Sequence, residues 1–323
     1  MKFILFFVSL VLLSFYGLSV WWSIEPECFS VTGRATLTNE TQGAVVTGYI
    51  TTNALIEIAS TLLNKPGGYL SNDILPPSVI MDNMPNWEFG VLVQIRDFAK
   101  VLRNDISRAQ TQSEENKWLA KAEPQFNIDS KSWIFPSSEG SYQKGIDYLV
   151  KYRDALSNTG DQKTQFFSRA DNLRDYLKIV ANRLGSLSQR LSASVGQNRI
   201  NTDLAGEPDA QFSTGMDSET IVKTLWFKLD DIFYESRGTC WALIHLLHAI
   251  EIDFKSVLEK KNAVVSVKQI IRELESTQES MFSPLILNGS GFGFVVNHSL
   301  VMSSYIARAN AGIIDLRDLL SKG

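Results

Sequence analysis

The chain has 323 residues, and its 31 lysine and arginine residues against 35 aspartate and glutamate residues give a formal net charge of −4. This balance argues against an extended phosphate-binding surface, so we expect no nucleic-acid partner. Two cysteines are too few for a disulfide framework, and the length allows one large hydrophobic core or two modest ones.

The first predicted element is a membrane-spanning helix at residues 3–22. This stretch, FILFFVSLVLLSFYGLSVWW, contains no charge and is as long as a helix must be to cross the hydrocarbon core of a bilayer. It is longer than the apolar core of a cleaved secretory signal. We therefore interpret residues 1–22 as an uncleaved signal anchor that contacts the lipid bilayer, with Trp21 and Trp22 as membrane-interface anchors.

The charges around this stretch predict its orientation. Lys2 and the N-terminal amine precede it, whereas Glu25 and Glu27 follow it. Positive residues stay on the cytoplasmic side of a membrane. We therefore expect a single-pass protein with the bulk of its chain outside the cytoplasm.

The rest of the chain is predicted to be helical. Residues 23–47 are polar, and we interpret them as a juxtamembrane tether. In residues 48–323, apolar residues repeat at helical spacing and alternating strand patterns are nearly absent. One regular seam runs from Phe166 to Leu191, and a second long helix is predicted for residues 218–261. The predicted fold is all-α: a transmembrane helix followed by a bundle of long amphipathic helices.

Three segments of this domain depart from the helical pattern. Residues 64–88 and 111–137 contain prolines and turn-forming residues but keep apolar side chains. This combination predicts two irregular loop regions that dock on another surface. Residues 196–217 combine glycine, proline, asparagine and aspartate, and we interpret this polar segment as a hinge.

Two groups of polar residues on the second long helix are candidate sites. His245, His248 and Glu251 are three residues apart and could together contact a metal ion, although three ligands on one helix rarely complete a tetrahedral site. We expect packing histidines and infer no metal or other cofactor. Cys240, on the same helix, is expected to pack as a small hydrophobe, and its pairing with Cys28 is left open.

Asp230, Asp231 and Glu235 form a compact acidic group, and such carboxylates can divide acid and base roles in catalysis. They can equally pair with arginines, so no catalytic residue is inferred. Trp87, Trp118 and Trp133 lie in or beside the irregular regions. These tryptophans either anchor a partner surface or fix the loops to the core.

Several segments are similar to a known family. The stretches KPGGYLSNDILPP, DNMPNWEFGVLVQIRDFAK, RLGSLSQRLSASVGQ and SPLILNGSGFGF resemble a proteobacterial family of single-span envelope proteins that is catalogued only as a domain of unknown function. The resemblance covers about residues 45–323. It implies a bacterial inner-membrane protein that faces the periplasm, and it supplies no activity, cofactor or catalytic residue.

These observations leave three functional hypotheses. The first is a non-enzymatic, membrane-anchored periplasmic helical module that binds or scaffolds an envelope protein partner, with the two irregular regions as its recognition surface. The second is a cell-envelope hydrolase or metal-dependent enzyme that uses the helix at residues 230–251. The third is a carrier of an apolar ligand. An enzyme predicts candidate residues that converge in one pocket, a scaffold predicts that they are dispersed, and a carrier predicts a cavity between helices.

Overall fold

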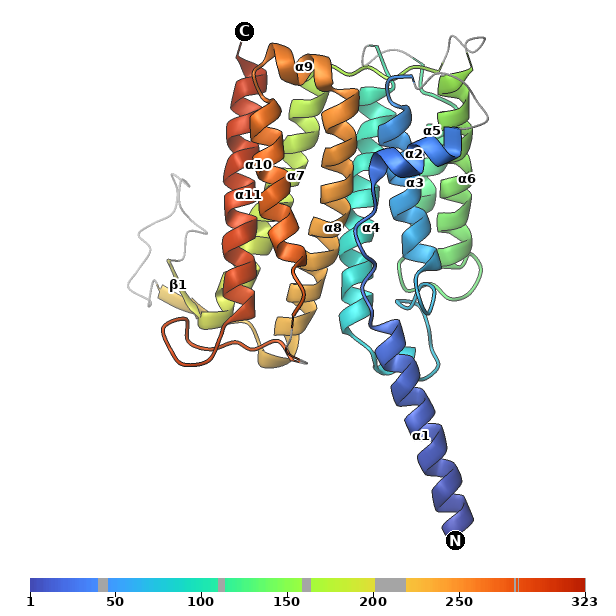
Figure 1. Ribbon diagram of the computed structural model, residues 1–323, viewed down its shortest axis with the longest axis vertical. Coiled ribbons are helices and arrows are strands. Elements are labelled where there is room, and N and C mark those ends of the chain that lie inside the picture. The colour runs from blue at the N-terminus through green and yellow to red at the C-terminus, as the bar shows by residue number, and fades with distance from the viewer. Residues whose placement is uncertain are drawn as a thin grey trace, which may run out of the picture.

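The body of the protein is an antiparallel bundle of helices from which the N-terminal helix leads away (Figure 1). The computed structural model describes residues 1–39, 46–109, 114–158, 164–200, 219–281, 283 and 285–322. The N-terminal helix is α1 (Lys2–Trp22). The other helices of the described residues are α2 (Val31–Asn39), α3 (Tyr49–Asn64), α4 (Asn83–Val101), α5 (Leu119–Phe126), α6 (Ser138–Ser157), α7 (Ala170–Ser192), α8 (Leu229–Asp253), α9 (Lys255–Lys260), α10 (Val264–Glu275) and α11 (His298–Ser321).

Successive long helices alternate in direction, so their connections collect at two opposite ends of the bundle (Figure 1). We call the end from which α1 leads away the proximal end. It contains the connections after α3, before α6 and before α11, and the described residues between α7 and α8. The opposite, distal end contains α9 and the C-terminus. This arrangement gives the two ends different surfaces, because each receives a different set of loops.

Helix α1 has the properties predicted for a membrane span. It is long and apolar enough to cross a bilayer, and none of its residues is buried by the rest of the protein. Trp21 is exposed, whereas the Trp22 ring lies against the backbone of Gly67 in the connection after α3. The last turn of α1 is therefore in direct contact with the proximal end of the bundle.

Helix α8 is the centre of the bundle. Almost every residue between Ser236 and Ile250 is buried, as the wide apolar arc of this segment predicts. Its backbone touches that of α4 at two glycines. A Cβ atom on Gly238 would lie 2.0 Å from the Trp87 carbonyl oxygen, and one on Gly90 would lie 2.1 Å from the Glu235 carbonyl oxygen. Only glycine permits this close crossing of the two helices.

The all-α prediction is confirmed for the bundle, with one small addition. Strands β1 (Gln197–Ile200) and β2 (Glu219–Val222) form an antiparallel pair at the proximal end. The predicted helix at 218–261 was wrong at its start, because α8 begins only at Leu229, where two aspartates in the first turn favour a helix N-terminus. Most of the predicted hinge at 196–217 lies outside the described residues.

The two predicted irregular regions contain more helix than expected. In residues 64–88, α4 already begins at Asn83, because Pro85 occupies the first turn, where its missing N–H is not needed. In residues 111–137, α5 forms with Pro124 near its C-terminal end, and its buried residues repeat at helical spacing. The prolines predict breaks in the helical pattern, but both positions lie where a helix tolerates proline.

The segment after α1 is not a free tether. Residues 24–36, which we call the strap, run along the bundle from the end of α1 and include the first part of α2 (Figure 1). Val31 and Ala35 are buried, and Phe29 packs on Trp241 and His245 of α8. The strap is polar overall, but these few apolar residues fix it to the surface of the bundle.

Candidate functional site

His245 holds the strap on α8. Its Nδ1 atom lies 2.7 Å from the Trp241 carbonyl oxygen, and its Nε2 atom lies 3.0 Å from the Phe29 backbone nitrogen. These partners assign a neutral ring, in which Nδ1–H donates and Nε2 accepts. Burial lowers the pKa of His245 to about 4. Because backbone groups are bonded to both ring nitrogens, neither nitrogen is available to a metal ion in this arrangement.

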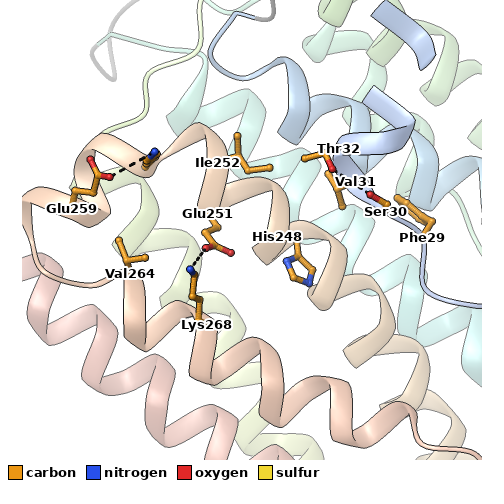
Figure 2. Close-up of a pocket in the computed structure, with 11 residues that line it drawn as sticks. Phe29, Ser30, Val31, Thr32, His248, Glu251, Ile252, Glu259, Val264 and Lys268 are labelled. Carbon is orange, nitrogen blue, oxygen red and sulfur yellow. Dashed lines mark hydrogen bonds and ion pairs between the residues drawn. The ribbon is translucent and has the colours of Figure 1, made fainter. Parts of the chain in front are cut away.

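A surface cavity of about 720 Å³ lies between the strap, α8, α9 and α10 (Figure 2). His248 and Glu251 line it from α8, and Lys268 approaches Glu251 from α10 at 3.6 Å. His248 lies 3.6 Å from Glu275. Within the described residues, no group of three His, Cys, Asp or Glu side chains could hold a metal ion. The predicted metal candidates thus have separate partners.

The acidic group at the start of α8 is also divided between neighbouring helices. Asp231 accepts a hydrogen bond from the Asn86 side chain of α4 at 2.8 Å. Partial burial and two nearby aspartates raise the pKa of Asp231. Glu235 instead forms a two-point ion pair with Arg190 of α7, at 2.5 and 2.9 Å. Asp231 and Glu235 therefore have separate polar partners, on α4 and on α7.

Arg237, one of the arginines that could have paired with the acidic group, pairs instead with the strap. Its guanidinium pairs with Glu25 of the strap at 2.8 Å and donates to the carbonyl oxygens of Thr277 and Glu279. Burial raises the pKa of Glu25, although the guanidinium opposes this effect. One buried arginine thus joins the strap, α8 and the segment after α10. An arginine inside an apolar helical run is the sequence signal for such a contact.

A second buried ion pair fixes the connection after α3. Lys65 Nζ lies 2.6 Å from Glu88 Oε1, and both side chains are fully buried. Glu88 also accepts hydrogen bonds from the backbone N–H groups of Leu70 and Ser71, each at 2.8 Å. Burial raises the pKa of Glu88, while Lys65 lowers it. This network holds the base of the connection rigidly on α4.

The three tryptophans of the predicted partner surface lie in three different environments. Trp87 is fully buried, with its ring centroid 5.2 Å from that of Trp241, which matches the alternative in which it fixes its segment to the core. It lies inside α4 and faces α8, which proximity to a proline-rich segment does not reveal. Trp133 is exposed at the proximal end, and Trp118 is half-buried at the start of α5.

Trp118 belongs to a cluster of cationic and aromatic side chains. Its ring stacks on that of Tyr148 of α6, with the centroids 6.5 Å apart. The ammonium groups of three exposed lysines lie over the two rings, at 4.8 to 5.9 Å from a centroid. We call this group the lysine–aromatic cluster; its members are Lys117, Trp118, Lys121, Tyr148 and Lys151.

No acidic side chain is shown to neutralise this cluster within the described residues. Glu115 and Glu123, which flank Lys117 and Lys121 in the sequence, pair with Arg103 instead. Cation–π contacts hold the three lysines close together despite their mutual repulsion. The cluster therefore creates a local positive potential on a protein with a net charge of −4.

A groove of about 510 Å³ lies between α8, the segment after α10, and α11. Phe233, Met281, Met302 and Tyr305 contribute to its walls. This is the feature of the described residues that corresponds to the predicted cavity of a carrier. It opens at the surface, so it is a groove along the bundle and not an enclosed space between helices.

The two cysteines are free. Cys240 is fully buried, as predicted for a small hydrophobe, and burial raises its pKa to about 12. Cys28 is exposed in the strap, and partial burial of its thiol raises the pKa to about 11. Neither thiol is a nucleophile near neutral pH, because nucleophilic cysteines require a lowered pKa.

Comparisons with known proteins add a family but no site. The profile of a family described as "uncharacterized protein conserved in bacteria (DUF2333)" matches residues 1–323. Methylenetetrahydrofolate reductase 1 of Schizosaccharomyces pombe is 24% identical over 125 residues, which cover 39% of this chain and 19% of that protein. The chain thus matches about a fifth of the length of that enzyme. A comparison with solved structures gives no match.

Proposed function

This chain belongs to DUF2333, a family of uncharacterized proteins conserved in bacteria, and from that premise we propose that it is a membrane-anchored periplasmic module that binds an acidic envelope protein. In this proposal α1 spans the inner membrane, with the helical body on the periplasmic side. The length and composition of α1 support the span. Lys2 before it and Glu25 and Glu27 after it support the orientation.

The observation that carries partner binding is the lysine–aromatic cluster. Three ammonium groups and two half-buried rings on adjacent helices form a preformed surface that is both cationic and apolar. Aromatic rings provide contact area at low entropic cost, and the lysines select carboxylates. The cluster lies in the half of α6 farther from α1, where a partner in the periplasm can reach it (Figure 1).

The dispersed carboxylates and histidines favour this function over an enzyme. His245 is occupied by backbone groups, Glu251 by Lys268, and Glu235 by Arg190. Catalysis needs such groups to converge on one reacting atom. Here they stabilise contacts between elements, which suits a rigid module that presents a surface.

Partner binding is tested with the full-length protein purified from membranes in mild detergent. Reversing the charge of the cluster, with Lys117→Glu, Lys121→Glu and Lys151→Glu together, should abolish co-purification of the acidic partner. The expected loss should also occur when salt is raised in the wild type, because screening weakens exposed charge pairs.

A matched control changes three exposed lysines elsewhere: Lys144→Glu, Lys178→Glu and Lys260→Glu. This variant changes the net charge by the same amount as the cluster variant and should still co-purify with the partner. If both triple variants recover the same proteins as the wild type, the cluster is not the binding surface. Protease added to spheroplasts should digest the body, and protection of the body would contradict the proposed orientation.

A further inference from the structure

Exposed apolar side chains gather at the proximal end of the body. The connection after α3 exposes Ile80, which retains 77% of its accessible surface, and the connection before α6 exposes Phe135 completely. The segment before α8 exposes Trp226, and the segment before α11 exposes Phe292 and Phe294 completely. Four connections that are far apart in the sequence thus present large apolar residues at the same end (Figure 1).

The distal end does not share this property. Its described connections, residues 46–48, 102–109, 114–118, 158, 164–169 and 254–263, contain no exposed large hydrophobic residue. Val265, in the first turn of α10, and Ile252, in the last turn of α8, are single exposed apolar residues nearby. Scattered apolar residues are normal on a protein surface, but a concentration at one end indicates a contact with an apolar phase or partner.

The end of α1 places the apolar connections at the level of a membrane surface. The Trp22 ring, in the last turn of α1, packs against Gly67 in the connection after α3. This same connection continues into the exposed segment that contains Ile80. A span that ends in contact with these residues would bring them next to the lipid headgroups.

The charges of these connections fit a bilayer. Residues 74–81, 132–138, 224–227 and 285–297 contain no charged side chain. Lys131 borders the second of these segments and Lys223 and Lys228 border the third, where their ammonium groups can reach anionic headgroups. Asp73, Asp82 and Glu139 border the first two segments. Aromatic residues such as Trp133 and Trp226 prefer the boundary between headgroups and acyl chains.

We infer that the proximal end of the body lies in the headgroup region of the leaflet from which α1 emerges, with the apolar tips of its four connections in contact with the acyl chains. This inference rests on the proposed span of α1. It adds a second membrane contact, made by the body itself, that fixes the orientation of the bundle relative to the bilayer. A protein partner could occupy any face, whereas the bilayer must adjoin the end at which the span enters.

The test uses full-length protein reconstituted into vesicles of phosphatidylethanolamine and phosphatidylglycerol. A nitroxide spin label is placed singly through Ile80→Cys, Phe135→Cys or Phe294→Cys. Labels through Leu10→Cys, in the middle of α1, and Val265→Cys, at the distal end, serve as references. The ratio of label accessibility to oxygen and to a water-soluble nickel chelate reports depth, because oxygen concentrates in hydrocarbon and the chelate in water.

Each label is introduced with Cys28→Ser, and the fully buried Cys240 is retained. The three proximal labels should give oxygen-to-nickel ratios at least about threefold above that at position 265, and below that at position 10. Ratios equal to that at position 265, with position 10 in hydrocarbon, overturn the inference alone. Low accessibility to both reagents assigns these residues to a protein contact and also overturns it. An aqueous ratio at position 10 overturns the span and the inference together.

Discussion

Acid should destabilise the fold through His245. The ring stays neutral because both nitrogens have backbone partners and because burial lowers its pKa from 6.5 to about 4. Arg34 of α2 and His248 of α8 act in the same direction as burial. A proton on Nε2 would remove the acceptor of the Phe29 N–H group. We therefore expect His245→Gln to remove part of the acid sensitivity of the fold.

The size of the effect follows from linkage. A folded-state pKa below the unfolded one stabilises the protein above pH 6.5, and this contribution is lost as the pH falls towards about 4. At about pH 5, protonation of His245 multiplies the statistical weight of the unfolded chain roughly 30-fold and that of the folded chain only about 1.1-fold. The free energy of unfolding is therefore lower by about 2 kcal/mol than it would be without this titration. Almost none of this loss is present at about pH 7.5.

Urea unfolding of the full-length protein in detergent, followed by circular dichroism, measures this difference. Between about pH 7.5 and about pH 5, the wild type should lose about 2 kcal/mol more stability than the His245→Gln variant. The His248→Gln variant should keep most of the wild-type loss, because His248 lowers the pKa of His245 less than burial does. Equal losses in wild type and His245→Gln would show that His245 is protonated in the folded state.

Two further predictions concern the core. Gly238→Ala would place a Cβ atom 2.0 Å from a backbone oxygen of α4 and should cost about 3 kcal/mol of unfolding free energy. Gly185→Ala, in α7, is the control, because its Cβ atom would lie 3.5 Å from the nearest atom, and this substitution should stabilise the protein by about 0.5–1 kcal/mol. Similar effects of the two substitutions would contradict the close crossing of α4 and α8. Lys65→Met should cost about 3–5 kcal/mol because Glu88 remains buried, and adding Glu88→Gln should recover part of this loss. A cost below about 1 kcal/mol, as measured for surface pairs, would contradict its buried role.

Much of the fold could be predicted from local patterns. The uncharged stretch at residues 3–22 predicts α1, and the spacing of Leu173, Leu177 and Leu184 predicts the buried face of α7. Helical periodicity depends only on residues within a few turns, so it can be read before any long-range contact is known. Helix starts were less certain. Leu225 and Trp226 continue an apolar run, yet both precede α8 and are exposed.

The candidate site depended on contacts between distant residues. Phe29 and His245 are 216 residues apart in the chain, and their hydrogen bond changes a candidate metal ligand into a structural residue. Trp87 became part of the core because Gly238 lets α4 approach α8 closely. Neither outcome can be derived from spacing along one segment.

The sequence by itself determined an apolar N-terminal helix long enough to cross a membrane and an amphipathic helical body, because charge and periodicity are properties of neighbouring residues. Only the tertiary structure decided which polar groups neutralise each other and which apolar residues remain uncovered. Burial and ion pairing depend on which segments the bundle brings together. Because its helices alternate in direction, the exposed apolar connections lie together at the proximal end, next to α1.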